Sequence, residues 1–590
     1  MTISLVIITR NEERNIERCI LSAHGIADEI LVVDSGSSDC TAAIARNCGA
    51  RVIYREWKGY ADQKNAANSF CTCDYILSLD ADEALSDALR SELLNIKTKL
   101  QGVYRINRLT NYCGKWIKHS GWFPDYHVRL FPREGMRWEG SLVHERPVFP
   151  GSPLVSTLKG PLYHYSYYSV IEHRQRADYY STLKAKELFL SGKSASFLKP
   201  LLSGVFRWLS MFLFKLGFLD GRAGLSIATV SAASNYFKYG ELRRLHKLSH
   251  TRPLRVIAIS RTDSIGDVVL TLPMAGIIKS QWPDCRIVFI GKTYTESVIR
   301  ACRNIDDFFN FDEWRSLDEA RQVTMLRGLK ADAIIHVFPQ PALARAAARA
   351  GIPVRIGNGR RVIHWFTCNK LPWFSRKHSL LHESQLNIRL LKPLLMPWRL
   401  SLQQIPPLYG MQAPEQVFPE VDSQLAAGKS LIILHPGSRG SAVEWGISNF
   451  AVLCGLFDLS RYVIAITGTS AERSLIDELE FPWQKSGVID LMGKLSLSAF
   501  IALLNRANFV VAASTGPLHI ASAMGKNVVG LYSPKRPIWP ERWAPVGDKA
   551  SWISASEHPS PGETLDIRPN DVYALIESRL FPETDNINRP

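Results

Sequence analysis

The sequence predicts an α/β protein with a parallel sheet that begins in the first 80 residues and two doubly wound lobes in the second half of the chain. Three observations lead to this fold class. Short apolar runs alternate with helical segments from residue 3 to about 80, and the same rhythm starts again at Leu254. A proline-rich stretch without periodicity, residues 396–428, divides this second series. At 590 residues the chain also exceeds the size of one hydrophobic core, so several domains are expected.

In the first half, the predicted strands are apolar runs at residues 4–9, 29–34, 51–56 and 74–80. Polar helical segments at 12–23 and from Cys40 onward separate them. The N-terminal run meets charge by Arg10 and has neither a basic leader region nor a small-residue cleavage site. It is therefore expected to be the first strand rather than a signal peptide.

In the second half, the predicted strands are at 255–260, 286–291, 332–338, 430–437, 462–468 and 508–515. One helix is expected over 268–282, and the polar, basic residues 241–253 suit a linker. The expected divisions are an α/β domain (1–160), a helical segment with linker (161–250), a first lobe (251–405) and a second lobe ending in a helix (406–590).

Half of the net charge of +16 lies in residues 161–250, which hold thirteen Lys or Arg against five Asp or Glu. Within them, SFLKPLLSGVFRWLSMFLFKLGFL interrupts bulky apolar side chains with Lys199, Arg207 and Lys215. Such a helix can rest on an anionic membrane surface, whereas three cations argue against a full span. The alternative is a core helix pair with one solvated face. Nucleic-acid binding is not expected, because no aromatic-interleaved basic strand or recognition helix accompanies the charge.

The ten cysteines are scattered and match no common zinc spacing, so they are interpreted as free thiols in a reducing cytosol.

Carboxylates gather where the strands of the first half end. Asp80 and Asp82, in LDADE, lie two apart, which places them on one face of an extended backbone where they can hold a divalent cation. Asp34 ends the second strand, where a carboxylate can accept from a base or ribose. Thr9 and Glu12 lie beside it, where the first strand ends and the first helix opens.

Together, SLVIITRNEERNIERCILSA, ILVVDSGSSDCT, GYADQKNAA and ILSLDADE resemble the motifs of glycosyltransferase family 2. GWFPDYHVRLFPR, RWEGSLVHERP and GFLDGRAG resemble its lipopolysaccharide-core β-glucosyltransferase branch. The resemblance covers nearly all of residues 1–245 and implies an inverting GT-A fold, a single Rossmann-like sheet.

That resemblance implies a role for each motif residue. Thr9, Glu12 and Asp34 would contact the uridine, and Lys64 would lie near the diphosphate. Asp80 and Asp82 would bind UDP through Mg²⁺ or Mn²⁺. An inverting transfer needs one base for the acceptor hydroxyl, and Asp125 or Glu145 would supply it. Alternatively, Asp125 caps a turn and Glu145 pairs with Arg146 or Arg129.

In the second half, three turns after strands suit a phosphate-bearing ligand. In RTDSIGD, Gly266 allows a sharp turn and places Asp267 at a helix N-terminus, where the alternative role is an N-cap. HPGSRGSAVEW is glycine-rich, hydroxyl-rich and basic. STGPLHIASAMGK would present Ser514, Thr515 and Gly516 at a helix start, with His519 one turn in.

These motifs, with LLHESQLNIRLL and GIPVRIGNGRR, resemble glycosyltransferase family 9, the ADP-heptose:lipopolysaccharide heptosyltransferases, over about residues 254–545. The resemblance implies a metal-independent, inverting GT-B enzyme with two Rossmann-like lobes, the first on the acceptor side and the second on the nucleotide-sugar side. Asp267 would be the general base. The donor would be held by Ser438, Arg439, Glu472, Ser514, Thr515, Gly516 and His519. The family carries lysine where this chain has Val443, so a charge-assisted contact to the leaving diphosphate is missing.

The sequence therefore predicts two fused glycosyltransferases at the cytoplasmic face of the inner membrane. The first would add a β-linked glucose from UDP-glucose and the second a heptose from ADP-heptose, both to a lipid A-core acceptor. The alternative is an active family 2 enzyme fused to a weakly active or non-catalytic binding module. A transferase acting on polyprenyl-linked glycans or on protein is a further rival.

Overall fold

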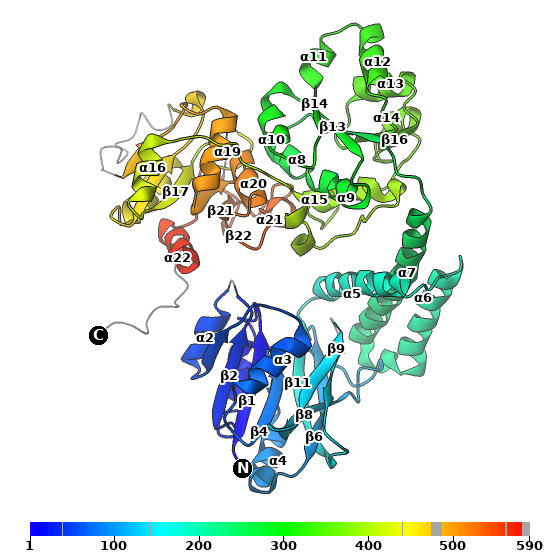
Figure 1. Cartoon of the computed structure of the whole chain (residues 1–590), viewed down its shortest axis with the longest axis vertical. Coiled ribbons are helices and arrows are strands. Elements are labelled where there is room, and N and C mark those ends of the chain that lie inside the picture. Colours follow the sequence, from blue (N-terminus) through cyan, green and yellow to red (C-terminus); the bar gives the residue numbers. More distant parts are fainter. Residues whose placement is uncertain (38, 142–143, 439, 474–486, 561–562, 581–590) are drawn as a thin grey trace. The chain divides into compact units, whose positions relative to one another are not determined.

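A computed structural model describes residues 1–590 except 38, 142–143, 439, 474–486, 561–562 and 581–590. The chain divides into two compact units, Met1–His246 and Lys247–Pro590 (Figure 1). Each unit is described by itself.

The main sheet of unit 1 has the order β3-β2-β1-β4-β8-β6-β11-β5, and β7 pairs with β6. Its parallel half, as the apolar runs predict, consists of β1 (Ile3–Thr9), β2 (Glu29–Asp34), β3 (Arg51–Tyr54) and β4 (Tyr75–Asp80). The other half contains β5 (Glu83–Leu85), β6 (Val103–Tyr112), β7 (Lys115–Trp116), β8 (Tyr126–Pro132) and β11 (Val155–Tyr167). A separate hairpin is formed by β9 (Arg137–Ser141) and β10 (His144–Val148).

Both faces of this sheet are covered, because successive side chains of a strand point to opposite faces. Leu5 and Ile7 of β1 pack in one core with α1 (Ile16–Ser22), α2 (Thr41–Asn47) and α4 (Asp87–Ile96). Val6 packs in a second core, with α3 (Tyr60–Ser69). In register, Thr9 pairs with Asp34 and Ile8 with Asp80, so the polar residues that end β1, β2 and β4 meet at one sheet edge.

Helices complete unit 1: α5 (Val170–Leu190), α6 (Lys199–Leu209), the π-helical η2 (Ser210–Phe214), the 3₁₀ turns η1 (Lys97–Lys99) and η3 (Gly217–Asp220), and α7 (Gly221–Ser249). Buried Asp220 ties this bundle to the sheet domain, because its carboxylate accepts from the backbone amides of Lys118 and His119 at 3.2 and 3.1 Å. The GFLDGRAG motif therefore has a structural function.

Two divisions expected from the sequence differ in the structure. Residue 160 falls inside β11, which pairs with β6 and β5, so the sheet continues to Tyr167. The linker expected at 241–253 is helical as far as Ser249, since Leu242 is buried and Glu241 pairs with Arg244 along the same helix.

Among the described residues, no single helix has the length and apolarity of a membrane span. One pair, Lys199–Phe214 with Gly217–Ser249, meets both conditions together but is bent by 73°.

Unit 2 contains two Rossmann-like lobes, as predicted. The first has the parallel order β14-β13-β12-β15-β16, with β12 (Val256–Ser260), β13 (Arg286–Gly291), β14 (Asp307–Asn310), β15 (Ala333–His336) and β16 (Val354–Gly357). Its helices are α8 (Ile265–Val269), α9 (Pro273–Gln281), α10 (Glu296–Arg300), α11 (Phe311–Arg315), α12 (Glu319–Gly328), α13 (Pro341–Arg349), α14 (Val362–Thr367) and α15 (Glu383–Ile388). The single helix expected over 268–282 is broken, because Pro273 begins α9 and its nitrogen cannot continue the hydrogen bonding of α8.

The second lobe has the parallel order β19-β18-β17-β20-β21-β22, with β17 (Ser430–His435), β18 (Tyr462–Ile466), β19 (Val488–Asp490), β20 (Phe509–Ala513), β21 (Asn527–Tyr532) and β22 (Ala550–Ser554). Its helices are α16 (Pro419–Ala426), α17 (Ile447–Leu456), α19 (Leu497–Arg506), α20 (Gly516–Ala523), α21 (Pro540–Trp543) and the expected C-terminal helix α22 (Pro569–Leu580). Short 3₁₀ turns η4 to η8 are at Thr293–Thr295, Arg389–Leu394, Leu402–Gln404, Pro406–Leu408 and Ser470–Glu472. A continuous apolar core contains residues of both lobes.

Candidate functional site

In unit 1, the predicted uridine contacts lie together at the carboxyl edge of the parallel strands. Asp34 accepts from the backbone amides of Gly36 and Ser37 at 3.0 and 2.9 Å, which shapes the turn after β2. Among the described residues, the buried hydroxyl of Thr9 has no hydrogen-bond partner. Glu12 lies near this edge, and burial raises its pKa above the ordinary value. The edge therefore offers an unused hydroxyl and two carboxylates to a ligand.

Asp80, whose side chain is 34% exposed, is the centre of an ion cluster with two buried cations. Arg129 Nη2 lies 2.6 Å from Asp80 Oδ2, and Lys64 Nζ lies 3.4 Å from Asp80 Oδ1. Burial opposes ionisation of Asp80, but the charges of Arg129 and Lys64 outweigh it and hold the pKa of Asp80 well below its usual range. Lys64 Nζ also donates to Glu145 Oε1 at 2.8 Å. One lysine thus connects the DxD motif to one of the two candidate bases.

Asp82 faces a different partner. His164 Nε2 on β11 lies 3.3 Å from Asp82 Oδ2. Burial opposes ionisation here too, and His164 lowers the pKa of Asp82 in spite of it. The two ionised carboxylates are hard oxygen donors of the kind that Mg²⁺ and Mn²⁺ prefer. In the described part of the chain, no group of three or more His, Cys, Asp or Glu side chains is arranged to hold a metal ion.

The two candidate bases differ in environment. Arg108 Nη2 lies 2.8 Å from Asp125 Oδ2, and His127 Nε2 lies 3.0 Å from the same oxygen. Burial acts to raise the pKa of Asp125, but His127 and Arg108 together lower it to about 2. Glu145 pairs with Lys64, not with Arg146 or Arg129 as the alternative expectation had it, and Arg129 is occupied by Asp80 and Glu83.

The site residues predicted for the second half of the chain line one cavity. A cavity of about 910 Å³ in unit 2 is lined by residues of both lobes. Its lining includes Asp267, the predicted base, and every predicted donor-site residue within the described part of the chain: Ser438, Glu472, Ser514, Thr515, Gly516 and His519. Arg439 lies outside the described residues. Val443 also lines the cavity, at the position where family 9 has lysine, and packs against the core of the second lobe.

Asp267 lies in the first turn of α8, but Ser264 is the N-cap of that helix. Ser264 Oγ donates to Asp267 Oδ2 at 2.7 Å, and Arg261 forms an ion pair with the other oxygen. The N-cap alternative for Asp267 is therefore wrong. Both oxygens of Asp267 are oriented by neighbours, as a positioned base requires.

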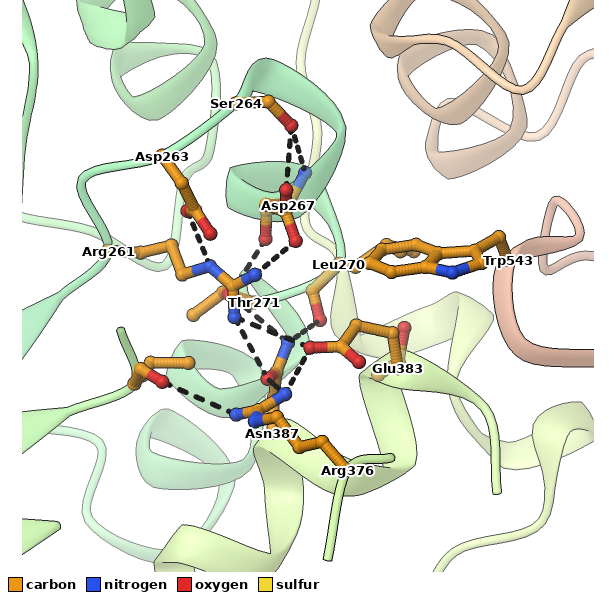
Figure 2. Close-up of polar contacts among 12 residues, drawn as sticks. Arg261, Asp263, Ser264, Asp267, Leu270, Thr271, Arg376, Glu383, Asn387 and Trp543 are labelled. Atoms are coloured by element: carbon orange, nitrogen blue, oxygen red, sulfur yellow. Dashed lines mark hydrogen bonds and ion pairs between the residues drawn. The ribbon is translucent and has the colours of Figure 1, made fainter. Parts of the chain in front are cut away.

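A buried network behind Asp267 was not foreseen from the sequence. Glu383 of α15, whose side chain is 2% exposed, pairs with Arg376, with Arg261 at 3.5 Å and with Arg542 of α21 at 3.1 Å. Figure 2 shows Arg261 between Asp263 and Asp267 on one side and Glu383 and Asn387 on the other. The motif LLHESQLNIRLL includes the residues of this helix and drew attention to it. The contact of Glu383 with Arg261 could not be predicted, because the two residues are 122 positions apart in the sequence.

The two lobes touch closely at the cavity. A Cβ on Gly266 would lie 3.0 Å from His519 Cδ2, and one on Gly516 would lie 2.7 Å from Ile265 Cγ2. His519 is buried, so its pKa falls to about 3 and its ring is neutral. Among the described residues its Nδ1 has no partner. Glu472 accepts from Thr469 N at 2.7 Å, which holds its carboxylate beside Gly437 in the cavity wall.

Residues missed in unit 1 are those that hold the carboxylates: Arg129 on Asp80, His164 on Asp82 and Arg108 on Asp125. Their strands, β8, β11 and β6, contribute them from the mixed half of the sheet, where β8 is antiparallel to its neighbours and β11 is parallel to β6. Their positions in the sequence carry no recognisable spacing to the aspartates.

Residues 4–146 match the model of glycosyl transferase family 2, and residues 325–566 match that of glycosyltransferase family 9 (heptosyltransferase). An uncharacterized glycosyltransferase of Rickettsia typhi is 32% identical over 256 residues, which are 41% of this chain and 87% of the relative. The lipopolysaccharide core biosynthesis glycosyltransferase LpsC of Rhizobium meliloti is 30% identical over 254 residues, 40% of this chain and 93% of LpsC. Among solved structures, E. coli ADP-heptose lps heptosyltransferase II covers 56% of this chain and 99% of its own, at 17% identity and a TM-score of 0.44.

The family matches fall on the two units whose sheets and sites have just been described. The chain therefore belongs to the glycosyltransferases, with a family 2 domain of GT-A fold in unit 1 and a family 9 domain of GT-B fold in unit 2.

Proposed function

We propose that the chain is a bifunctional glycosyltransferase of lipopolysaccharide inner-core synthesis. Unit 1 transfers a glucose from UDP-glucose with inversion, and unit 2 transfers a heptose from ADP-heptose with inversion, both to a lipid-anchored core acceptor. The observation that carries this proposal is the convergence of Asp267 and the donor-site residues of both lobes on one cavity. The name of the relative LpsC supports lipopolysaccharide core as the acceptor.

In unit 2, Asp267 takes the proton of the acceptor hydroxyl while that oxygen attacks the anomeric carbon opposite the leaving diphosphate. Arg261 and Ser264 orient the carboxylate. The hydroxyls and amides at the start of α20 face the diphosphate, where a helix N-terminus favours negative charge.

In unit 1, Asp80 and Asp82 would hold Mg²⁺ or Mn²⁺, which neutralises the charge of the UDP leaving group when bound. Lys64 contributes a further cation at the same place, and the free hydroxyl of Thr9 is available to the nucleoside. Asp125 and Glu145 both remain candidates for the base.

We also propose that the protein lies at the cytoplasmic face of the inner membrane. The α6 patch comprises exposed apolar side chains of unit 1: Phe197, Leu198, Leu201, Leu202, Val205, Phe206, Leu213 and Phe214. Lys199, Arg207 and Lys215 lie among them in the sequence, as an anionic lipid surface requires. Fusion of the two units raises the local concentration of one product at the other site.

The deciding experiment is mass spectrometry of the acceptor after incubation with UDP-glucose and ADP-heptose, comparing wild type with Asp82→Ala and Asp267→Ala. Loss of one distinct sugar in each variant is expected. If Asp267→Ala leaves heptose transfer unchanged, the second centre is wrong.

A second candidate is favoured by Val443: unit 2 binds acceptor or nucleotide sugar without efficient turnover. The missing charge-assisted contact is worth about 1.5 to 3 kcal/mol. Under this alternative, Val443→Lys raises heptose transfer by about tenfold or more, and robust transfer by the wild type eliminates it.

A further inference from the structure

A second exposed apolar surface lies in unit 2, on α14 and the segment that follows it. We name it the tryptophan platform, and its members are Val362, Trp365, Phe366, Leu371 and Trp373. Phe366 is 81% exposed and Trp373 66% exposed. Large apolar side chains gathered in this way, outside any core, mark a surface that meets a partner.

The platform is held rigid by Gly359. The indole Nε1 of Trp365 donates to Gly359 O at 2.6 Å, and Gly359 N donates to Pro372 O at 2.9 Å. A Cβ on Gly359 would lie 2.6 Å from the Trp373 ring, which therefore packs directly on that glycine. The Trp365 and Trp373 rings stack with centroids 6.3 Å apart. A surface ordered in advance loses little conformational entropy on docking.

The charged residues in the stretch of chain that carries the platform all have one sign. Residues 360–378 contain five Lys or Arg and no Asp or Glu. Four of these cations are exposed: Arg360, Arg361, Lys370 and Lys377. The fifth, Arg376, is committed to Glu383. Exposed tryptophans with exposed cations close to them in the sequence suit the boundary between lipid headgroups and acyl chains of an anionic bilayer.

α14 also lines a second cavity of unit 2, to which both lobes contribute. This cavity, of about 260 Å³, is lined by Arg361 and His364 of this region and also by Asp267. His364 is buried, and among the described residues its Nε2 has no partner. The helix α14 therefore contributes both to the tryptophan platform and to a cavity that the candidate base of unit 2 also lines.

We propose that the tryptophan platform docks unit 2 on the headgroup region of an anionic bilayer and brings the cavity of Asp267 to lipid-anchored acceptors. The acceptor part of this inference rests on the proposed function, whereas the docking part stands on the platform alone. The docking is separate from that of the α6 patch, which belongs to unit 1.

The test measures binding of the full chain to vesicles of phosphatidylcholine, with or without phosphatidylglycerol. Phe206→Ser with Phe214→Ser disables the α6 patch and provides the background. In that background, Phe366→Ser with Trp373→Ser should weaken binding to the anionic vesicles by about tenfold or more, from the apolar area lost. Arg360→Gln and Lys377→Gln should each weaken it about fivefold. Val417→Ser is the control, because Val417 lies in unit 2 outside the platform and its exposure, 73%, is between those of Trp373 and Phe366. This substitution should leave vesicle binding unchanged.

Benzoylphenylalanine at position 366 should crosslink to lipid, whereas the same probe at position 417 should not. Unchanged vesicle binding after Phe366→Ser with Trp373→Ser overturns the proposal. So does loss of self-association in that variant, since the platform would then be an interface between two copies of the chain.

Heptose transfer to a water-soluble, deacylated acceptor separates this inference from the proposed function. The platform variant should keep its activity on that acceptor and lose it on the membrane-bound one. If the wild type transfers no heptose to either acceptor, the proposed function fails while the vesicle result still decides the docking.

Discussion

Replacing Glu383 with glutamine should destabilise unit 2 strongly. The Glu383 carboxylate is 2% exposed and is shared by Arg261, Arg376 and Arg542, so its neutralisation leaves three buried or nearly buried guanidinium groups without their common counter-charge. Breaking a buried ion pair by removing one partner costs about 3 to 5 kcal/mol. Burial opposes ionisation of Glu383, but the three arginines hold its pKa below the usual value, so the side chain is charged at neutral pH.

The effect is measured by differential scanning calorimetry of the full chain, and the transition of unit 2 should move down by roughly 4 to 7 °C. Glu319→Gln is the matched control, because Glu319 pairs with Arg349 on the surface, with side chains 64% and 58% exposed. Such a pair is worth at most about 1 kcal/mol. If Glu383→Gln lowers the transition no more than Glu319→Gln does, the network does not hold the lobes as the distances indicate.

Three further predictions concern pH, packing and charge. Unit 2 should lose stability as pH falls from 6.5 toward 5. In this range histidines bind protons in the unfolded chain, whereas four buried histidines of the folded unit have pKa values of about 3 to 4 and stay neutral. They are His336, His382, His435 and His519. Each histidine contributes up to about 1.4 kcal/mol of lost stability per pH unit. Asp263 opposes this loss by binding one proton in the folded state, because burial and Asp267 raise its pKa to about 6. Denaturation at several pH values is the measurement, and a stability that does not change with pH would refute the prediction. Gly266→Ala should reduce heptose transfer, because the added methyl group would contact His519. Gly328→Ala is the control and should leave heptose transfer unchanged, because a methyl group there would have no atom within 4 Å. Equal transfer rates in the two variants would contradict the close contact between the lobes. Lys64→Met should lower glucose transfer by about tenfold to a hundredfold without altering heptose transfer, and an unchanged glucose rate would remove Lys64 from the site.

Much of the candidate site could be predicted because its residues follow strands. In a parallel sheet, every strand that ends in a polar turn delivers that turn to the same edge. Asp34 after β2 and Asp80 at the end of β4 could therefore be placed together before the sheet was known. The same logic brought Asp267, Ser438 and Thr515 to one cavity from three separate turns.

The partners of these residues could not be predicted. Arg129, His164 and Arg108 come from the mixed half of the unit 1 sheet, where strand order does not follow chain order. The π-helical turn after α6 and the bend that follows it could not be predicted either, since the apolar pattern of that segment continues through them.

By itself, the sequence determined the α/β class and the carboxylates and phosphate-binding turns at the strand ends, because strand periodicity and turn chemistry are local properties of the chain. The two family domains were indicated by the resemblance of its motifs to glycosyltransferase families 2 and 9. Only the tertiary structure decided which charges surround each carboxylate. Glu383 meets Arg261 and Arg542 across 122 and 159 residues of chain. Such contacts depend on how the lobes pack, since Coulomb attraction and burial act over distance in space rather than along the sequence.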